Sequence, residues 1–257
     1  MCNASLFDLS GRKALVTGAS RGIGRSLAEA LSAAGAEVAV TARNAGSLEE
    51  TVFAIQARGG IAHAVAMDVT SVESCMQGVD AAVERLGGLD ILVNNAGVEE
   101  VRASLDVDEA LWDKILDTNL KGAFFCAQAA ARAMKGAGHA GAIINLCSLT
   151  SLVGIPTAVP YGSSKSGLLG MTRALATEWA ASNIRVNAIV PGYFRTAMTE
   201  SFYEDEAWQQ AMLGKIPQRR FGNLDDLHGV AIFLCSQASA YITGQAIPVD
   251  GGYLASI

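Results

Sequence analysis

The sequence predicts a doubly wound α/β fold, in which a parallel seven-stranded sheet carries helices on both faces. Short β-like runs alternate with longer stretches of helical apolar spacing along the whole chain of 257 residues. Only 17% of the residues are charged and 51% are hydrophobic, which suits a sheet buried on both faces. The first β-like run also leads directly into a turn rich in glycine. Together these observations favour a parallel sheet that binds a ligand at its edge.

The β-like runs are short and apolar, and glycine or polar residues bound them. The seven expected strands cover 13–18, 37–43, 62–69, 89–97, 141–148, 184–192 and 244–252. Six stretches have apolar residues at helical spacing, namely 24–36, 47–60, 72–88, 108–138, 161–181 and 225–239. The stretch 108–138 is expected to form one long helix. Because the pattern alternates strand and helix, the strands should run parallel.

One domain is expected to occupy residues 1–257, since single α/β domains reach about 250 residues. No linker, repeat or low-complexity segment interrupts the alternation. The segment 193–222 is long for a simple connection between a strand and a helix. Long ordered insertions in compact domains are often lids, so this segment is expected to close over a substrate.

Charge and cysteine usage exclude several classes of protein. The net charge of −6 argues against a nucleic-acid binder, which would carry a basic stripe. No run of about 18 apolar residues is present to span a membrane. The cysteines lack CxxC or metal-ligand spacing and are expected to be reduced thiols of a cytoplasmic protein: Cys2, Cys75, Cys126, Cys147 and Cys235. The histidines have no ligand-like neighbours, so no metal site is expected: His63, His139 and His228.

The glycine-rich turn has the form expected of a dinucleotide-binding loop. Gly18, Gly22 and Gly24 lie in TGASRGIG, between the first strand and the first helix. Glycines there let the backbone turn tightly and approach a pyrophosphate, and the helix N-terminus offers free N–H groups and partial positive charge. The spacing is G-x-x-x-G-x-G rather than G-x-G-x-x-G, but its position at the first strand–helix turn makes it a strong signal.

The end of the second strand distinguishes the two nicotinamide cofactors. An acidic residue there would bind the adenosine ribose of NAD, whereas an arginine would accommodate the 2′-phosphate of NADP. The strand ends with Ala42 where an acid is expected, and Arg43 follows. Arg21 in the glycine loop could join Arg43 in holding the phosphate. The sequence therefore favours NADP(H) over NAD(H), the alternative being that both arginines are only solvated.

Six motifs follow one another along the chain: TGASRGIG (17–24), NNAG (94–97), Asn119 in DTNLKG, Ser148 in NLCS, YGSSK (161–165) and VPG (190–192). Together they resemble the motifs of the short-chain dehydrogenase/reductase family in its single-domain branch. The resemblance covers essentially residues 6–257 and implies a Rossmann fold. Within the family, the chain looks most like 3-oxoacyl-carrier-protein reductases and gluconate or polyol dehydrogenases.

The resemblance also implies a role for individual residues. The implied catalytic residues are Asn119, Ser148, Tyr161 and Lys165. The implied cofactor contacts are Gly18, Ser20, Arg21, Gly22, Ile23, Gly24, Arg43, Asp68, Val69, Asn95, Ala96, Gly97, Tyr161, Lys165, Pro191, Gly192 and Thr196. Cys147 departs from the family pattern, which commonly has a serine before the catalytic serine.

Carbonyl reduction requires a proton donor, and a tyrosine with a lowered pKa would suit that role. Tyr161 and Lys165 are four residues apart in an expected helix and so share a face, where the lysine would lower the pKa of the phenol. Ser148 follows a strand at the carboxyl edge of the sheet and could hydrogen-bond the substrate oxygen. Asn119 could hold a water that relays protons to Lys165.

The expected reaction is NADPH-dependent, reversible reduction of a ketone or aldehyde, with Tyr161 as the acid–base group. Aromatic and apolar residues of the lid suit a substrate with an apolar portion: Tyr193, Phe194, Met198, Phe202, Tyr203 and Trp208. Glu99 and Glu100 near the expected mouth disfavour an anionic sugar acid. Cations that argue the other way are Arg195, Lys215, Arg219 and Arg220. A neutral substrate is the favoured hypothesis.

Several alternatives stay open at this point. Within the enzyme class they are an NAD-dependent polyol or gluconate-type dehydrogenase and a 3-oxoacyl-carrier-protein reductase, for which Arg132, Lys135 and Arg173 are candidate docking cations. A nucleotide-binding regulator without turnover is the alternative outside it. Family resemblance also predicts a homotetramer in which helices 108–135 and 161–181 pair across one interface.

Overall fold

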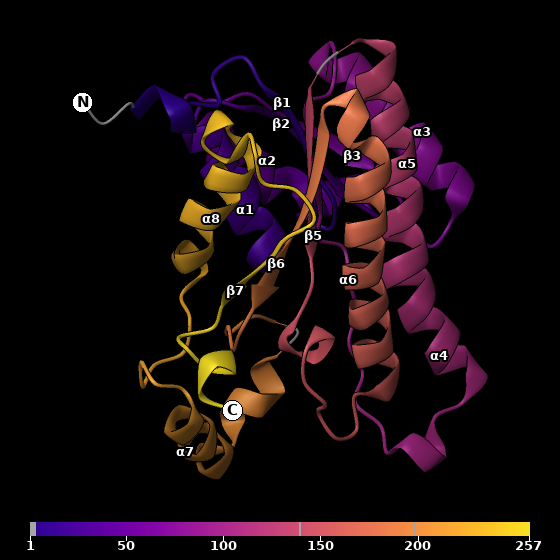
Figure 1. Ribbon diagram of the computed structural model, residues 1–257. Coiled ribbons are helices and arrows are strands. Elements are labelled where there is room, and N and C mark those ends of the chain that lie inside the picture. The colour runs from indigo at the N-terminus through magenta and orange to yellow at the C-terminus, as the bar shows by residue number, and fades with distance from the viewer. Residues whose placement is uncertain (1–3, 139, 198) are drawn as a thin grey trace.

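The computed structural model of the chain describes residues 4–138, 140–197 and 199–257, so the expectations for Cys2, His139 and Met198 lie outside it. It contains one seven-stranded sheet with the strand order β3-β2-β1-β4-β5-β6-β7 (Figure 1). The strands are β1 Lys13–Val16, β2 Glu37–Ala42, β3 Ala62–Ala66, β4 Ile91–Asn94, β5 Gly141–Leu146, β6 Ile184–Pro191 and β7 Ala246–Val249. Every neighbouring pair is parallel, which confirms the predicted sheet.

Helices cover both faces of this sheet. The α-helices are α1 Gly22–Ala33, α2 Glu49–Gln56, α3 Val72–Leu86, α4 Glu109–Leu116, α5 Gly122–Gly136, α6 Val159–Trp179, α7 Glu206–Lys215 and α8 His228–Cys235. In Figure 1, α1, α2 and α8 lie on one side of the sheet, and α3, α5 and α6 lie on the other. The doubly wound prediction is therefore confirmed.

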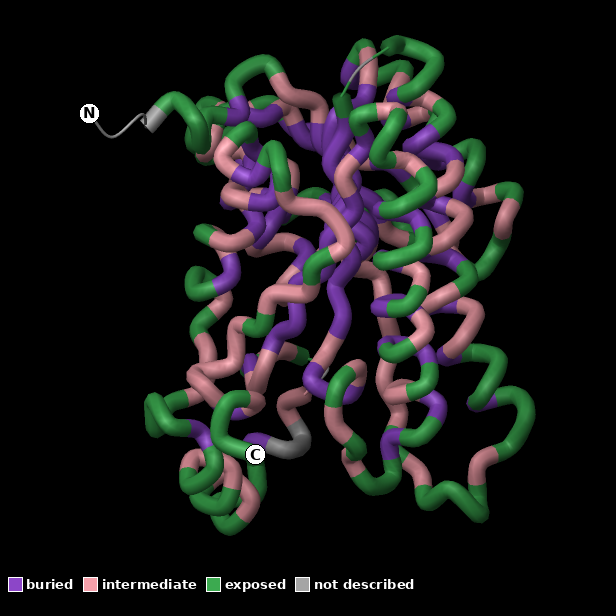
Figure 2. Tube along the Cα trace, viewed as in Figure 1, coloured by how far each residue is buried: buried purple, intermediate pink, exposed green. Residues whose placement is uncertain are grey.

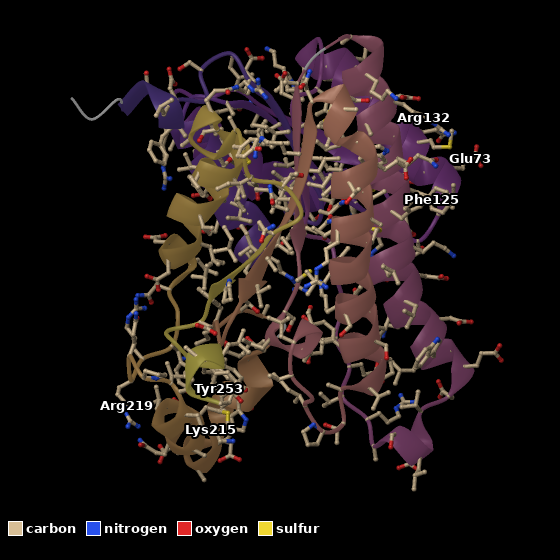
Figure 3. All side chains as sticks on the ribbon, in the orientation of Figure 1. Glu73, Phe125, Arg132, Lys215, Arg219 and Tyr253 are labelled. Atoms are coloured by element: carbon tan, nitrogen blue, oxygen red, sulfur yellow. The ribbon has the colours of Figure 1, made fainter. Side chains whose placement is uncertain are left out.

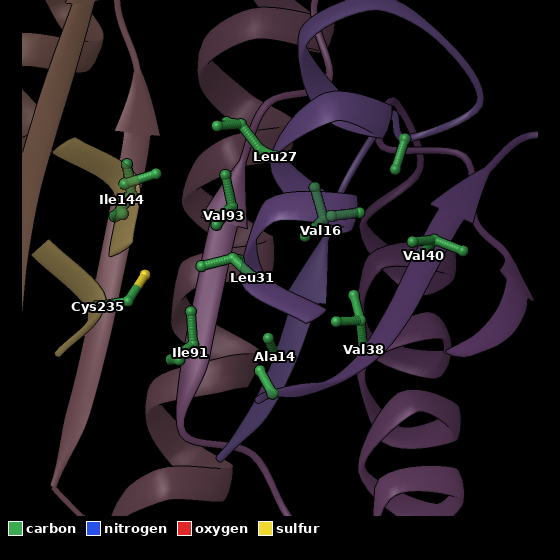
Figure 4. Packing of buried hydrophobic residues seen from close by; sticks show 14 of the residues in the cluster. Ala14, Val16, Leu27, Leu31, Val38, Val40, Ile91, Val93, Ile144 and Cys235 are labelled. Atoms are coloured by element: carbon green, nitrogen blue, oxygen red, sulfur yellow. The ribbon is translucent and has the colours of Figure 1, made fainter. Parts of the chain in front are cut away.

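The strands form because their β-branched residues pack on both faces at once. Figure 4 shows strand residues packed against α1 and α8, including Val16, Val38, Ile91, Val93 and Ile144. On the other face, Leu15, Leu92 and Ile143 contact the buried sides of α3, α5 and α6. Figure 2 shows this buried sheet as the continuous centre of the molecule. The central strands are therefore covered on both faces, which explains why their sequences do not alternate between apolar and polar residues.

The prediction of one long helix over 108–138 is wrong in one respect. The chain is helical from Glu109 to Gly136, but a π-helical turn at Asp117–Lys121 separates α4 from α5. Single π-turns insert an extra residue into a helix and are frequent at functional sites. Here the turn contains Asn119, whose side chain is buried.

The observed strands end earlier than the sequence predicts at the carboxyl edge. Asp68 and Ser148 were expected at strand ends but lie in the loops beyond β3 and β5, while Gly18 and Gly97, expected in turns, follow β1 and β4. Backbone that leaves the ladder can face a ligand, so these loops form the edge where doubly wound sheets bind their ligands.

The segment 193–222 leaves the sheet after β6 and returns beside its starting point. It contains a short helical turn at Glu200–Glu204 and α7. Phe194 pairs with Gly222, and the Gly222 N–H donates to the Tyr193 carbonyl at 2.9 Å. The two ends of the segment are thus hydrogen-bonded to each other. Its α7 lies beyond the carboxyl ends of the strands (Figure 1).

None of the described helices is both long and apolar enough to cross a membrane.

Candidate active site

The glycine loop after β1 has the geometry that a phosphate ligand requires. Gly18 and Gly22 have positive φ angles of 63° and 57°, which residues with a side chain rarely adopt. A methyl group on Gly24 would overlap the Asn95 side chain and the Gly18 carbonyl. α1 begins at Gly22, and its N-cap residue, Arg21, provides no side-chain cap. The first N–H groups of α1 are therefore oriented for an anionic ligand, so these residues fit the pyrophosphate of a dinucleotide.

The NNAG segment is fastened to this loop. The Thr17 hydroxyl accepts hydrogen bonds from the backbone N–H groups of Asn95 and Ala96, both at 3.0 Å. The Asn95 side chain donates to the Thr17 and Gly18 carbonyls, both at 2.9 Å. The sequence analysis placed Asn95 and Ala96 on the cofactor side but gave no role to Thr17, although it is the first residue of the TGASRGIG motif.

Arg43 and Asp68 interact electrostatically beyond the ends of β2 and β3, and Arg21 lies in the glycine loop. Both arginines are exposed, and Asp68 is partly buried. The Asp68 carboxylate accepts hydrogen bonds from the Thr70 N–H and hydroxyl, at 3.0 and 2.8 Å. These bonds, with a smaller contribution from the charge of Arg43, lower the pKa of Asp68. The sequence analysis held that nothing acidic lies near Arg43, and this is wrong because Asp68 interacts with it.

Ser148, Tyr161 and Lys165 come together beyond the end of β5. Ser148 caps a short helical turn at Leu149–Ser151, two residues after the strand ends. The Ser148 hydroxyl lies close enough to the Tyr161 phenol to lower its pKa. The Lys165 ammonium lies 5.7 Å from the centre of the Tyr161 ring. The structure therefore brings the serine, the tyrosine and the lysine of the sequence motifs into one cluster.

The pKa of Tyr161 differs in direction from the expectation. Burial raises it above its ordinary value, and the negative charge of Glu99 raises it further, while the Ser148 hydroxyl acts in the opposite direction. The prediction of a lowered pKa for Tyr161 is therefore wrong for the protein groups alone, because burial raises it. Burial also lowers the pKa of Lys165. Desolvation explains both shifts, because it disfavours the charged form of each group.

Lys165 is held by the strand beside it. Its ammonium donates to the Leu146 carbonyl at 2.6 Å, and only 4% of the residue is exposed. Gly97 lies next to it, since a methyl group there would come within 3.6 Å of the ammonium nitrogen. The carboxyl end of β5 and the NNAG loop therefore fix the position of the Lys165 ammonium.

Asn119 uses its whole side-chain amide to hold neighbouring segments. Its oxygen accepts from the Val98 N–H at 2.8 Å, and its nitrogen donates to the Val98 carbonyl at 2.9 Å and to the Ser164 hydroxyl at 3.1 Å. Ser164 in turn donates to the Tyr161 carbonyl at 2.7 Å. Asn119 therefore joins the NNAG loop to α6. The sequence analysis did not assign a role to Ser164, although the residue lies within YGSSK.

Pro191 is the last residue of β6, Gly192 follows it, and Thr196 approaches the glycine loop. A methyl group on Gly22 would lie 3.7 Å from the Thr196 Cβ, so Thr196 is adjacent to the loop. A methyl group on Gly192 would overlap Asp250, which explains why glycine is needed there. The start of the 193–222 segment therefore lies over the site where the cofactor was expected. Ile23, by contrast, packs partly into the core, and Val69 lies against Gly122 at the start of α5.

The two glutamates after NNAG have different surroundings. Glu100 forms ion pairs with Arg102 at 2.6 Å and with Lys114 at 3.0 Å. Glu99 is half-buried and interacts electrostatically with Lys165 and Tyr161. The expectation that both carboxylates lie together at the mouth is therefore wrong, because ion pairing draws Glu100 away.

Most of the cations expected to oppose these glutamates have partners of their own. Arg195 pairs with Glu200 at 2.5 Å, and Arg220 pairs with Asp226 at 2.6 Å. Arg219 donates to the Gly214 carbonyl at 2.8 Å. In Figure 3, Arg219 and Lys215 lie at the α7 end of the molecule, beside Tyr253.

The aromatic residues of the 193–222 segment pack mainly on one another. Trp208 makes edge contacts with Tyr193 and Tyr203, with ring centres 5.6 and 5.3 Å apart, and stacks on Phe221 at 6.1 Å. Phe194 belongs to the main core. The side chain of Phe202 lies outside the described residues. Among these aromatic residues, Tyr193 interacts electrostatically with Glu99 and so connects the segment to the site.

The cysteines and histidines described by the structure form no metal centre. No group of three or more His, Cys, Asp or Glu residues is placed to hold a metal ion within residues 4–138, 140–197 and 199–257. Cys75, Cys126, Cys147 and Cys235 are buried free thiols. His228 contacts the Ser26 hydroxyl at 2.7 Å, between α8 and α1.

Comparison with known proteins agrees with this geometry. A family profile described as Enoyl-(Acyl carrier protein) reductase matches residues 18–254. The chain is 40% identical over 258 residues to gluconate 5-dehydrogenase of Gluconobacter oxydans, with complete coverage of both chains.

Two solved structures are also similar. One is a protein provisionally assigned as a short-chain alcohol dehydrogenase from Sinorhizobium meliloti 1021, with 72% identity and a TM-score of 0.96 over 98% of this chain and 100% of that one. The other is a gluconate 5-dehydrogenase from Burkholderia cenocepacia in complex with NADP and tartrate. It is 36% identical, with a TM-score of 0.95 over 98% of this chain and 99% of that one.

The chain therefore belongs to the short-chain dehydrogenase/reductase family. Its members named here are oxidoreductases that act on CH–OH or C=O groups, and the protein is an enzyme of this class.

Proposed function

We propose that the protein is an NADP(H)-dependent oxidoreductase that reversibly reduces the carbonyl group of a small molecule to an alcohol, with Tyr161 as the acid–base group. The carrying observation is the cluster of Ser148, Tyr161 and Lys165 beside the glycine loop. A phenol and a serine hydroxyl that meet at the carboxyl edge of the sheet can hold a carbonyl oxygen between two donors.

The proton step follows from the pKa of the phenol. Because burial and Glu99 raise the pKa of Tyr161, the phenol keeps its proton at neutral pH and can donate it to the substrate oxygen. Ser148 donates to the same oxygen and orients it, and the buried Lys165 ammonium stabilises the phenolate that remains. A bound reduced nicotinamide supplies the hydride. Asn119 acts as a positioning residue, because it fixes the NNAG loop against α6.

The cofactor would occupy the loops at the carboxyl edge. The residues proposed to hold it are Gly18, Ser20, Arg21, Gly22, Ile23, Gly24, Arg43, Asp68, Val69, Asn95, Ala96, Gly97, Tyr161, Lys165, Pro191, Gly192 and Thr196. Arg43 follows the second strand without an acid at Ala42, which supports NADP(H) over NAD(H). The bound NADP of the Burkholderia cenocepacia relative is consistent with this preference.

Two substrate classes have support. The half-buried carboxylate of Glu99 in the site favours a neutral ketone, aldehyde or polyol. The full-length similarity to gluconate 5-dehydrogenase favours a gluconate-type sugar acid as the second candidate. A 3-oxoacyl-carrier-protein substrate has less support, since Arg132 and Lys135 lie towards the far end of α5, away from α7 and the candidate site (Figure 3).

The remaining features of the enzyme are part of the same proposal. Residues 1–257 form one catalytic domain, with the 193–222 segment as its substrate lid. The enzyme acts in the cytoplasm as a homotetramer, and an apolar groove beside α4, α5 and α6 supports an interface there. The groove has a volume of about 390 Å³ and is lined by Leu116, Asp117, Leu120, Lys121, Phe124 and Met171.

A substrate panel assayed with NADPH and NADH, and in reverse with the oxidised cofactors, tests this function. The panel contains neutral ketones, aldehydes, polyols, gluconate and a 3-oxoacyl thioester. We expect turnover of small carbonyl or hydroxyl compounds, faster with NADP(H). Arg43→Ala should weaken NADPH binding at least about tenfold, because a phosphate loses a charge-assisted partner, and leave NADH binding unchanged. Absence of turnover with every compound, despite cofactor binding, would favour a nucleotide-binding regulator instead.

A further inference from the structure

Glu99 occupies a fixed position between two anchored points of the chain. On one side, Val98 exchanges hydrogen bonds with the Asn119 side chain, at 2.8 and 2.9 Å. On the other side, the Arg102 N–H donates to the Thr157 carbonyl at 2.8 Å. The residues 98–102 therefore bridge the NNAG loop and the loop that precedes α6. Glu99 belongs to the wall of the site rather than to a free surface loop.

The carboxylate of Glu99 lacks the partners that its neighbour has. Glu100 is satisfied by Arg102 and Lys114. For Glu99, the described residues provide no hydrogen bond and no ion pair, although the residue is half-buried. Its charge acts on Lys165, Tyr161 and Tyr193, which come from α6 and from the start of the 193–222 segment. Gly97, two residues earlier, lies next to the Lys165 ammonium, and Val98 is bonded to Asn119, so Glu99 follows directly on residues that line the site.

The nearby cations do not neutralise this carboxylate directly. Lys165 donates to the Leu146 carbonyl, while Arg102 and Arg195 pair with other acids. Burial raises the pKa of Glu99, as expected for a carboxylate that lacks compensation, although Lys165 opposes that shift. A hydrogen-bond donor on a substrate would satisfy Glu99, whereas a carboxylate placed there would be repelled.

We propose that Glu99 is the residue that selects substrate charge. Its carboxylate accepts a hydrogen bond from a hydroxyl near the reacting carbon of a neutral polyhydroxylated ketone, aldehyde or polyol, and it excludes the corresponding sugar acid. This inference rests on the proposed function and narrows its substrate class.

Kinetics with a matched pair of substrates test the proposal. Sorbitol and gluconate have the same carbon chain and differ in one charged end, and both are assayed with NADP⁺. Wild type should prefer the polyol in kcat/KM, and Glu99→Gln should reduce that preference at least about tenfold through a lower KM for gluconate, because a like-charge contact is removed. Glu100→Gln is the matched control and should change the ratio less than about twofold, as expected for an exposed, paired charge.

A binding measurement makes the test independent of turnover. Calorimetry with tartrate on the NADP⁺-loaded protein should give at least about tenfold tighter binding to Glu99→Gln than to wild type, and no change for Glu100→Gln. The inference is overturned if wild type prefers gluconate and Glu99→Gln changes neither the kinetic ratio nor tartrate binding. Failure of the proposed function is a separate result, namely no wild-type turnover of any hydroxyl or carbonyl compound with either cofactor.

Discussion

At the scale of single residues, burial has more effect on the site than pairing does. Tyr161 and Lys165 share a helix face, as the spacing predicts, yet desolvation raises the pKa of the phenol and lowers that of the ammonium. The free enzyme therefore keeps Tyr161 protonated, which suits a proton donor. Lys165 is better described as a buried charge that favours the phenolate once the proton has left.

This arrangement predicts the direction of a pH effect. Reduction needs the protonated phenol, so its kcat/KM should fall only at alkaline pH, while alcohol oxidation needs the phenolate and should rise with pH. Glu99, Cys147 and Lys165 are the titratable groups around Tyr161. Glu99→Gln removes a negative charge that raises the pKa of Tyr161, so the oxidation profile should move to lower pH. Profiles measured at saturating cofactor check this, with Glu100→Gln expected to overlay wild type. An unmoved profile in Glu99→Gln would contradict the assignment.

At the scale of elements, a buried polar chain ties the central strands to the catalytic helix. The Asn94 side chain donates to the side-chain oxygen of Asn145 at 2.9 Å, and the side-chain nitrogen of Asn145 donates to the Thr172 hydroxyl at 2.9 Å. Asn145 and Thr172 are fully buried, and Thr172 lies on α6 with Tyr161 and Lys165. The chain of bonds runs from β4 through β5 to α6, so it fixes the helix that carries the acid–base group.

Breaking this chain of hydrogen bonds should destabilise the protein. Thr172→Val leaves the buried Asn145 amide without its partner and should lower the free energy of unfolding by about 1–3 kcal/mol. Thr177→Val is the matched control, because Thr177 bonds a carbonyl four residues back on the same helix but is exposed. That variant should stay within about 0.5 kcal/mol of wild type. Equal urea midpoints for the two variants would show that the buried chain contributes nothing.

The sequence predicts the elements well and their ends less well. Period and glycine turns identify all seven strands and their parallel order, because buried β-branched runs leave few alternatives. The π-turn at Asp117–Lys121 could not be foreseen, since its residues keep a helical pattern and only the tertiary contacts of Asn119 reveal it. The strands also end early where the chain turns toward the site.

Charges at the site were the least predictable part. Glu99 and Glu100 are adjacent and chemically identical. No local sequence pattern therefore indicates that Glu99 is half-buried without a partner while Glu100 forms ion pairs. The distinction depends on Lys114 and Arg102, whose positions come from the fold. The same holds for Arg43, which has Asp68 as an acidic neighbour although 25 residues separate them in the sequence.

At the scale of the whole molecule, the apolar groove beside α4, α5 and α6 suggests how copies assemble. Two small residues of α6 pack inside the same chain: Ser164 contacts Asn119, and Gly167 faces Leu120. The partly exposed side chains of Phe124 and Met171 remain for an interface. An interface at this face would cover apolar surface that water otherwise contacts.

Light scattering tests this assembly. Wild type should have the mass of a tetramer, and Phe124→Glu should lower it by burying a charge at the interface. Phe53→Glu is the matched control, because Phe53 is 72% exposed on α2, away from the groove. It should leave the mass unchanged. Circular dichroism of both variants separates dissociation from unfolding. A monomeric wild type, or a folded Phe124→Glu that keeps the wild-type mass, would contradict the interface.

The central claim is that Tyr161 donates the proton at a nicotinamide site, and NADPH oxidation by Tyr161→Phe tests it most directly. The variant loses one hydroxyl and keeps the ring, so NADPH should bind to it as to wild type. Turnover of the best substrate found in the panel should fall by about 10²–10⁴-fold, the contribution of a positioned acid–base group. Unchanged turnover with intact NADPH binding would contradict the account.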